Sequence, residues 1–147
     1  MNENTDSQAV QIALRYFEDG FNCAQSVFMA YDYITALSSA EAARIMSGFG
    51  GGVGKSGGMC GAFTAVVALI GSGHGREKAE QMDRQANTYS LVQKAMGDFE
   101  NRFGSINCHN LLGNDILARG VKEKARDEVC PELLEFACDL VERYALG

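Results

Sequence analysis

The sequence predicts an all-α protein, a single-domain bundle of five to seven helices with a glycine-rich loop before a central buried helix. Three observations support this fold class. Apolar residues recur every three or four positions along most of the chain, no segment alternates as a half-buried strand does, and proline occurs once in 147 residues. The length and the 46% hydrophobic content suit one domain over residues 1–147.

The N-terminal part of the chain predicts two helices. The first has one apolar face, formed by Ala9, Ile12, Ala13, Tyr16 and Phe17. Gly20 ends it, because glycine readily adopts the left-handed conformation that follows a helix. Asn22 then caps a second helix, with Gln25 three residues later as in a capping box. The apolar positions of this second helix extend to Ile34.

A third, short helix and a glycine-rich loop follow. Ser38 or Ser39 caps the helix, which runs through Ala42, Ile45 and Met46 to Gly48. Seven of the eleven residues from 48 to 58 are glycine, and the backbone entropy cost of so many glycines excludes a regular element there. The segment 60–70 is apolar on every side, which predicts a central buried helix.

The longest predicted helix spans residues 76–103, roughly 42 Å at 1.5 Å per residue. Its apolar stripe consists of Ala79, Met82, Ala86, Tyr89, Val92, Met96, Phe99 and Phe103. Asn107 caps a short helix after it, a charged helix covers 121–129, and the last helix starts at Pro131, whose fixed φ suits the first helical position. A helix as long as 76–103 favours a homodimer, since its partners must match its reach or belong to a second subunit.

Composition excludes several function classes. The net charge of −6 and the pI near 4.9 argue against nucleic acid as a partner, because phosphate binding needs a basic surface. The longest apolar run, 62–70, is far shorter than the ~20 residues that span a bilayer. The first residues are polar and acidic, unlike a signal peptide, so we expect a cytoplasmic protein without membrane insertion.

The five cysteines are the residues that indicate function. A reducing cytoplasm disfavours a static disulfide framework, so cysteines there are buried fillers, metal ligands or reactive thiols. Cys23, Cys60, Cys108 and Cys130 each fall at a predicted helix start. Cys138 lies in mid-helix and is expected to fill the core.

A helix start favours the thiolate over the thiol, because it presents unpaired N–H groups and about half a positive charge. The thiolate is the nucleophile of thiol redox chemistry. The leading hypothesis is therefore a thiol redox protein, and, if an enzyme, a thiol oxidoreductase. Cys60 would be the attacking thiolate with a lowered pKa, Cys23 its resolving partner, and Cys108 and Cys130 a second pair or a relay. This chemistry requires no cofactor and acts on an unknown redox partner or small molecule.

Two alternatives remain open. The same four residues, Cys23, Cys60, Cys108 and Cys130, could ligate zinc or an iron–sulfur cluster. No C-x2-C or C-x4-C pair occurs, so the fold alone would have to assemble such a site. The other alternative is a helical interaction module in which the cysteines only fill the core.

The glycine-rich loop suggests ligand binding. A Walker A motif ending at Lys55 fails, because the motif needs glycine where Phe49 stands. A loop rich in backbone N–H groups could still form an anion-binding nest, or move as a lid over the adjacent thiol. We predict Gly57, Gly58 and Gly61 as cofactor-binding residues.

The segment from Gly57 to Ala62 resembles the signature of the C-GCAxxG-C-C family of redox-active proteins. The resemblance extends over nearly the whole chain, to Cys23 in an Asn-Cys-Ala-Gln context and to Cys108 and Cys130 downstream. Ala65 stands where the signature has its final glycine, a mild change on a helix. The resemblance implies that the same four cysteines form the site, and it implies no particular reaction.

Overall fold

The computed structural model describes the backbone of residues 3–113 and 121–147 and the side chains of residues 8–113 and 127–147. These ranges contain seven α-helices, one isolated β-bridge and no strand, which confirms the all-α class. The helices are α1 Glu3–Glu18, α2 Cys23–Ala30, α3 Ser39–Met46, α4 Gly61–His74, α5 Met82–Phe103, α6 Cys108–Leu112 and α7 Val121–Leu140.

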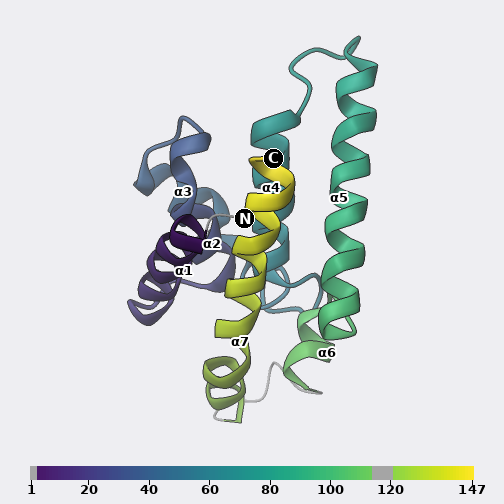
Figure 1. Cartoon of the computed structure of the whole chain (residues 1–147). Helices are drawn as coiled ribbons and strands as arrows, with labels where there is room; N and C mark the ends of the chain where they lie inside the picture. The colour runs from purple at the N-terminus through teal and green to yellow at the C-terminus, as the bar shows by residue number, and fades with distance from the viewer. Residues whose placement is uncertain (1–2, 114–120) are drawn as a thin grey trace.

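Helix α4 is the centre of the structure, as the sequence predicts. Helices α1, α2 and α3 lie on one side of it, α5 on the other, and α7 runs across its front in Figure 1. The buried face of α4 includes Phe63, Val66, Leu69 and Ile70, all of which are fully excluded from solvent. Burying a large apolar side chain contributes about 1.5–3 kcal/mol, so this one helix supplies a large share of the core.

The predicted caps of the N-terminal half are confirmed. Asn22 and Gln25 form the capping box of α2, and Ser38 forms that of α3. Helix α2 ends four residues earlier than predicted, at Ala30, and a 3-10 turn follows. The reason lies at Tyr31, whose fully buried hydroxyl donates to the carbonyl of Cys138 at 3.2 Å and ties the end of α2 to α7.

Helix α5 begins at Met82, six residues later than predicted. The side chain of Gln81 accepts hydrogen bonds from the N–H groups of Glu77 and Lys78, at 2.8 and 3.1 Å, and so closes a turn where the helix was expected. The helix is therefore about 33 Å long. Met82 and Tyr89 of the predicted stripe are 66% and 61% exposed, and the homodimer stays a prediction.

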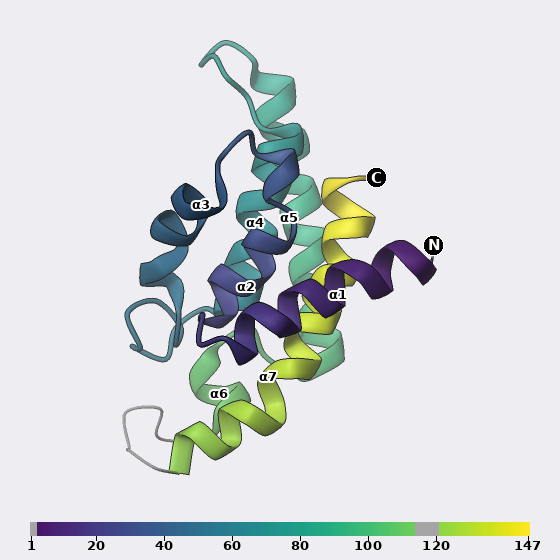
Figure 2. The same cartoon turned by 90° about the vertical axis from the view of Figure 1, so that its left-hand side faces the viewer.

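Helix α7 replaces the two helices predicted on either side of residue 130. It is continuous from Val121 to Leu140 and contains Pro131 in its interior. Proline there lacks the N–H donor and crowds the preceding turn, which bends a helix without necessarily ending it. Figure 2 shows α7 changing direction along its length. Cys130 therefore lies inside a helix, and the prediction that it stands at a helix start is wrong.

Within the described ranges, no helix combines the length and the apolar character that crossing a bilayer requires.

Candidate functional site

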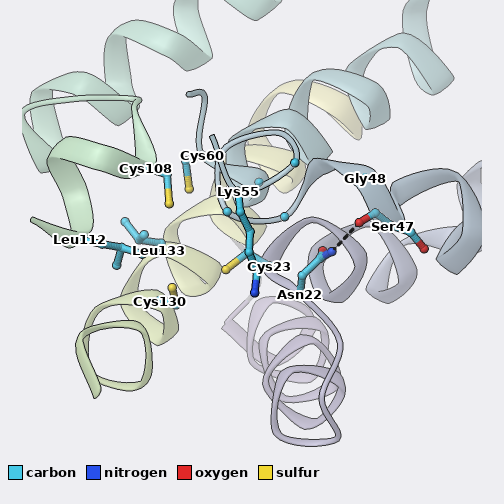
Figure 3. A pocket seen from close by; sticks show the side chains of 14 residues that line it. Asn22, Cys23, Ser47, Gly48, Lys55, Cys60, Cys108, Leu112, Cys130 and Leu133 are labelled. Atoms are coloured by element: carbon cyan, nitrogen blue, oxygen red, sulfur yellow. Dashed lines mark hydrogen bonds between the residues drawn. The ribbon is translucent and has the colours of Figure 1, made fainter. Parts of the chain in front are cut away.

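A cavity of about 270 Å³ opens where the starts of α2, α4 and α6 meet the middle of α7. Figure 3 shows the side chains that line it. All four cysteines singled out from the sequence contribute to this one cavity. The lining residues are Asn22, Cys23, Ser47, Gly48, Gly50, Gly51, Gly54, Lys55, Cys60, Gly61, Cys108, Leu112, Cys130 and Leu133.

Cys23 is held at the cavity by the cap of α2. The Gln25 backbone N–H donates to Asn22 Oδ1 at 2.8 Å, and the Asn22 backbone N–H donates to Gln25 Oε1 at 3.1 Å. The same two amides also reach across to the end of α3. Asn22 Nδ2 donates to the carbonyl of Ser47, and Gln25 Nε2 donates to that of Ala43. The capping box therefore fixes the first turn of α2 and the start of the glycine loop together.

Gly61 brings the start of α4 against the start of α2. A Cβ atom at this position would lie 3.0 Å from the carbonyl oxygen of Phe49 and 3.1 Å from the backbone nitrogen of Ala24. Any side chain would push the two helix starts apart. The close approach at Gly61 and Ala24 places the preceding residues, Cys60 and Cys23, next to each other.

A short antiparallel ribbon brings Cys60 and Cys108 together. It is centred on an isolated bridge between Met59 and Asn107. Two backbone hydrogen bonds of 2.7 Å hold it, from Cys60 N–H to the carbonyl of Ile106 and from Cys108 N–H to the carbonyl of Gly58. Side chains alternate between the faces of such a ribbon, so both cysteines project from the face opposite to the bridging pair. Figure 3 shows the two thiols side by side and pointing the same way.

Helix α7 supplies the remaining wall. Cys130 is buried, and Leu133 lies one turn later on the same face. Leu112, at the end of α6, adds a second apolar side chain. Cys138 is fully buried in the core and does not line the cavity, in agreement with its predicted role as a filler.

Cys60 differs from the prediction in its acidity. It is the N-cap residue of α4, and the N–H groups of Ala62 and Phe63 favour its thiolate. Burial opposes them, because the thiol is only 2% exposed, and the charge of nearby Cys23 adds to burial. Burial is the larger effect and raises the pKa of Cys60 to about 12. The expected lowering of this pKa is therefore wrong in this conformation.

The glycine loop forms a left-handed turn. Five consecutive residues, Gly51, Gly52, Val53, Gly54 and Lys55, have φ between +58° and +76°. Every backbone N–H from Val53 to Gly58 donates to a carbonyl oxygen of residues 48–53. These donors are already used, so they are not available for the anion-binding nest predicted from the sequence. Gly52 is essential to the turn, since a Cβ there would lie 2.5 Å from the backbone of Gly58.

Of the three glycines predicted to bind a cofactor, one lies at the cavity and two do not. Gly61 lines the cavity, whereas Gly57 and Gly58 lie outside the lining. The carbonyls of these two accept the N–H groups of His109 and Cys108 instead, so they position α6. Sequence reasoning missed the other lining residues, because the left-handed turn and the position of α7 cannot be read from local patterns.

The cysteines do not match a site for a single metal ion. Among the described residues, no three Cys, His, Asp or Glu side chains lie close enough together to hold one ion. Zinc bound by these four thiols, as the sequence allowed, is therefore not supported by this arrangement.

The fold and the site define an all-α protein with a cavity lined by four cysteines from distant parts of the chain. A family model described as "Putative redox-active protein (C_GCAxxG_C_C)" matches residues 21–144, and the chain belongs to this family. The match covers all the cysteines and every residue that lines the cavity. No curated protein and no solved structure shows significant similarity.

Proposed function

We propose that the protein is a thiol–disulfide redox protein in which Cys23 is the attacking thiol and Cys60 its buried partner. The observation that carries this proposal is the graded exposure of the thiols around one cavity. Cys23 is partly exposed, whereas Cys60, Cys108 and Cys130 are buried. A disulfide substrate would therefore meet Cys23 first.

The order of ionisation supports the same assignment. Burial penalises the thiolate of Cys60, and the negative charge of Cys23 raises the pKa of Cys60 further. The raised pKa of Cys60 makes it a poor first nucleophile, and it ionises more readily once the negative charge beside it has been consumed. The charge of Cys108 also raises the pKa of Cys60, so Cys60 lies close to two other thiols. That position suits a thiol that receives a disulfide from one neighbour and passes it to the other.

The proposed reaction has two exchange steps. The Cys23 thiolate attacks a disulfide RSSR, forming a Cys23–S–S–R bond and releasing RS⁻, which takes up a proton. Cys60 then loses its proton to solvent, attacks the Cys23 sulfur and releases a second RS⁻. The protein dithiol is oxidised to a disulfide and RSSR is reduced to two RSH. In the reverse direction the protein acts as an oxidant.

The test is to trap the mixed disulfide. Reduced protein is mixed with bis(hydroxyethyl) disulfide, and the products are located by peptide mass spectrometry. In Cys60→Ala the Cys23–S–S–R adduct should accumulate, because the thiol that resolves it is absent. In Cys23→Ala the first step should slow at least tenfold, roughly the loss expected when only buried, protonated thiols remain.

Cys138→Ala is the matched control, because this cysteine is buried away from the cavity and should react as the wild type does. Circular dichroism establishes that each variant is folded. Unchanged kinetics in Cys23→Ala would refute its role as attacking thiol. Rapid formation of an adduct on Cys60 in that variant would show that the sequence-based assignment of Cys60 holds in solution.

The arrangement also favours a second candidate, an iron–sulfur cluster. Four thiols around a space are the ligand set that such clusters require, and their deprotonation in a buried site needs a cation. A bound cluster would supply one-electron transfer. Anaerobic reconstitution with iron and sulfide tests it. Stoichiometric iron and sulfide that survive gel filtration, and that are lost in each of the four Cys→Ala variants, would favour the cluster over the dithiol.

A further inference from the structure

We propose that the cavity selects small anionic disulfides, and that the Lys55 ammonium group recognises their negative charge. This inference rests on the proposed thiol–disulfide exchange and names the class of its substrate. Lys55 is exposed and lines the cavity that also contains Cys23. In Figure 3 its side chain extends over the cavity toward the Asn22–Cys23 end.

Among the described residues that line the cavity, Lys55 is the one that carries a charge. The chain as a whole carries a net charge of −6, so a cationic surface at the mouth of the reactive site is not a by-product of overall composition. In the part of the lining that the structure describes, no carboxylate neutralises this charge or repels an anion. The local charge therefore favours anions at the position where Cys23 is accessible.

Other polar groups at the mouth are already engaged. Asn22 Nδ2 donates to the carbonyl of Ser47 at 3.0 Å, and the Ser47 hydroxyl donates to the carbonyl of Ala43 at 2.8 Å. The backbone N–H groups of residues 53–58 are bonded within the loop. Among the described lining residues, the Lys55 ammonium group is therefore the cationic hydrogen-bond donor. Its three N–H bonds can reach a carboxylate without breaking any of these contacts.

The backbone of the loop holds Lys55 in place. Its φ of +58° is a conformation that non-glycine residues rarely adopt, and its N–H donates to the carbonyl of Gly50 at 3.1 Å. Gly51 packs so closely that a Cβ there would lie 2.7 Å from Lys55 Cγ. The fixed backbone therefore sets the position from which the lysine side chain extends over the cavity.

The size of the cavity restricts the substrate. A volume of about 270 Å³ lies just below the usual range for drug-sized ligands, so it fits a small molecule better than a protein segment. Leu112 and Leu133 give it an apolar wall that suits the methylene groups of a substrate. The substrate class is thus a short aliphatic disulfide with a carboxylate or similar anionic group.

The experiment compares three short disulfides that differ in charge: dithiodiglycolate, bis(hydroxyethyl) disulfide and cystamine. The rate constant for oxidation of the reduced protein is divided by that of the same disulfide with mercaptoethanol, which removes differences in intrinsic reactivity. The normalised rate should be about three- to tenfold higher for the anionic than for the neutral disulfide, and lowest for the cationic one. The preference should shrink as salt is added.

Lys55→Gln should abolish the preference, and Lys55→Arg should keep it. Lys55→Gly removes the side chain and also relieves the positive φ, so it should abolish the preference in a loop that is at least as stable. Lys78→Gln is the matched control, because Lys78 is exposed on the turn before α5 and does not line the cavity.

Two failures can be distinguished. If none of the disulfides oxidises the wild-type protein, the proposed exchange reaction itself is refuted. If all three react but the normalised rates are equal, or if Lys55→Gln keeps the anionic preference, the exchange stands and the role of Lys55 is wrong.

Discussion

The acidity of Cys60 shows how one residue can carry two opposing effects. As the N-cap of α4 it faces backbone N–H groups, which stabilise a thiolate by an amount that rarely exceeds about 2 kcal/mol. Burial outweighs them, and together with the charges of Cys23 and Cys108 it raises the pKa of Cys60 from 9.0 to about 12. Position on a helix therefore does not identify a reactive thiol unless water also reaches it, as it reaches Cys23.

The difference between the pKa of Cys60 in the folded and in the unfolded protein predicts how stability depends on pH. Above pH 9 the unfolded chain releases the Cys60 proton while the folded protein keeps it, so the free energy of unfolding falls until the pH approaches 12. Relative to Cys60→Ala, the wild type should lose up to about 1.4 kcal/mol per pH unit in this window. Urea denaturation of both proteins under reducing conditions between pH 8 and about 10.5 measures it. If the free energy of unfolding changed with pH in the same way in both proteins, Cys60 would not be buried as a protonated thiol.

At the scale of elements, the left-handed turn is the strained part of the fold. Glycine adopts positive φ at little cost, but Val53 has φ of +68° and its branched side chain crowds the backbone there. Such strain persists where surrounding contacts determine the conformation, and it concentrates at functional sites. Here the contacts are the internal hydrogen bonds of the loop, and the function that we propose for them is to hold Lys55 beside the thiols.

Val53→Asn should therefore stabilise the protein by about 1 kcal/mol, because asparagine tolerates the left-handed region and residue 53 is exposed. The rise should appear in thermal and urea denaturation. Val53→Ile is the control: it keeps the branched Cβ and should give no gain. A loss of stability in Val53→Asn would mean that the valine side chain makes a contact worth more than the backbone strain.

At the scale of the whole molecule, the site joins elements that are distant in the chain. Cys23 and Cys60 enclose a 38-residue segment that contains α2, α3 and the glycine loop. A disulfide between them would restrict the unfolded chain far more than the folded one. Such a disulfide would link the redox state of the cavity to the stability of the entire fold.

Oxidation is accordingly expected to stabilise the protein by about 2–4 kcal/mol, the range for a loop of this length. The measurement is the difference in urea midpoint between the fully reduced protein and the oxidised protein, with the bond located by peptide mapping. The increase should vanish in Cys23→Ala. An oxidised form that unfolds at lower urea would indicate that the fold must distort to bring these two thiols into bonding distance.

The sequence by itself determined most of the helices and the four cysteines that line the cavity. Periodicity and capping boxes are local signals, so Asn22, Ser38 and the apolar helix after Cys60 were predicted correctly. The boundaries that failed, at Met82 and Pro131, depend on contacts that such patterns do not contain. A glutamine side chain closes the turn before α5, and core packing on both sides of Pro131 tolerates a bend.

Only the tertiary structure decided how the four cysteines relate to one another. Their convergence depends on a glycine that lets α4 approach α2, on a two-bond ribbon between residues 58–60 and 106–108, and on the side of α7 that faces α6. Each of these is a long-range contact. Burial, which is a property of the packed molecule, then made Cys60 a weak acid and left Cys23 as the thiol that solvent reaches. The sequence specifies the residue types, but the exposure of each thiol and its distance from the others are determined only by folding.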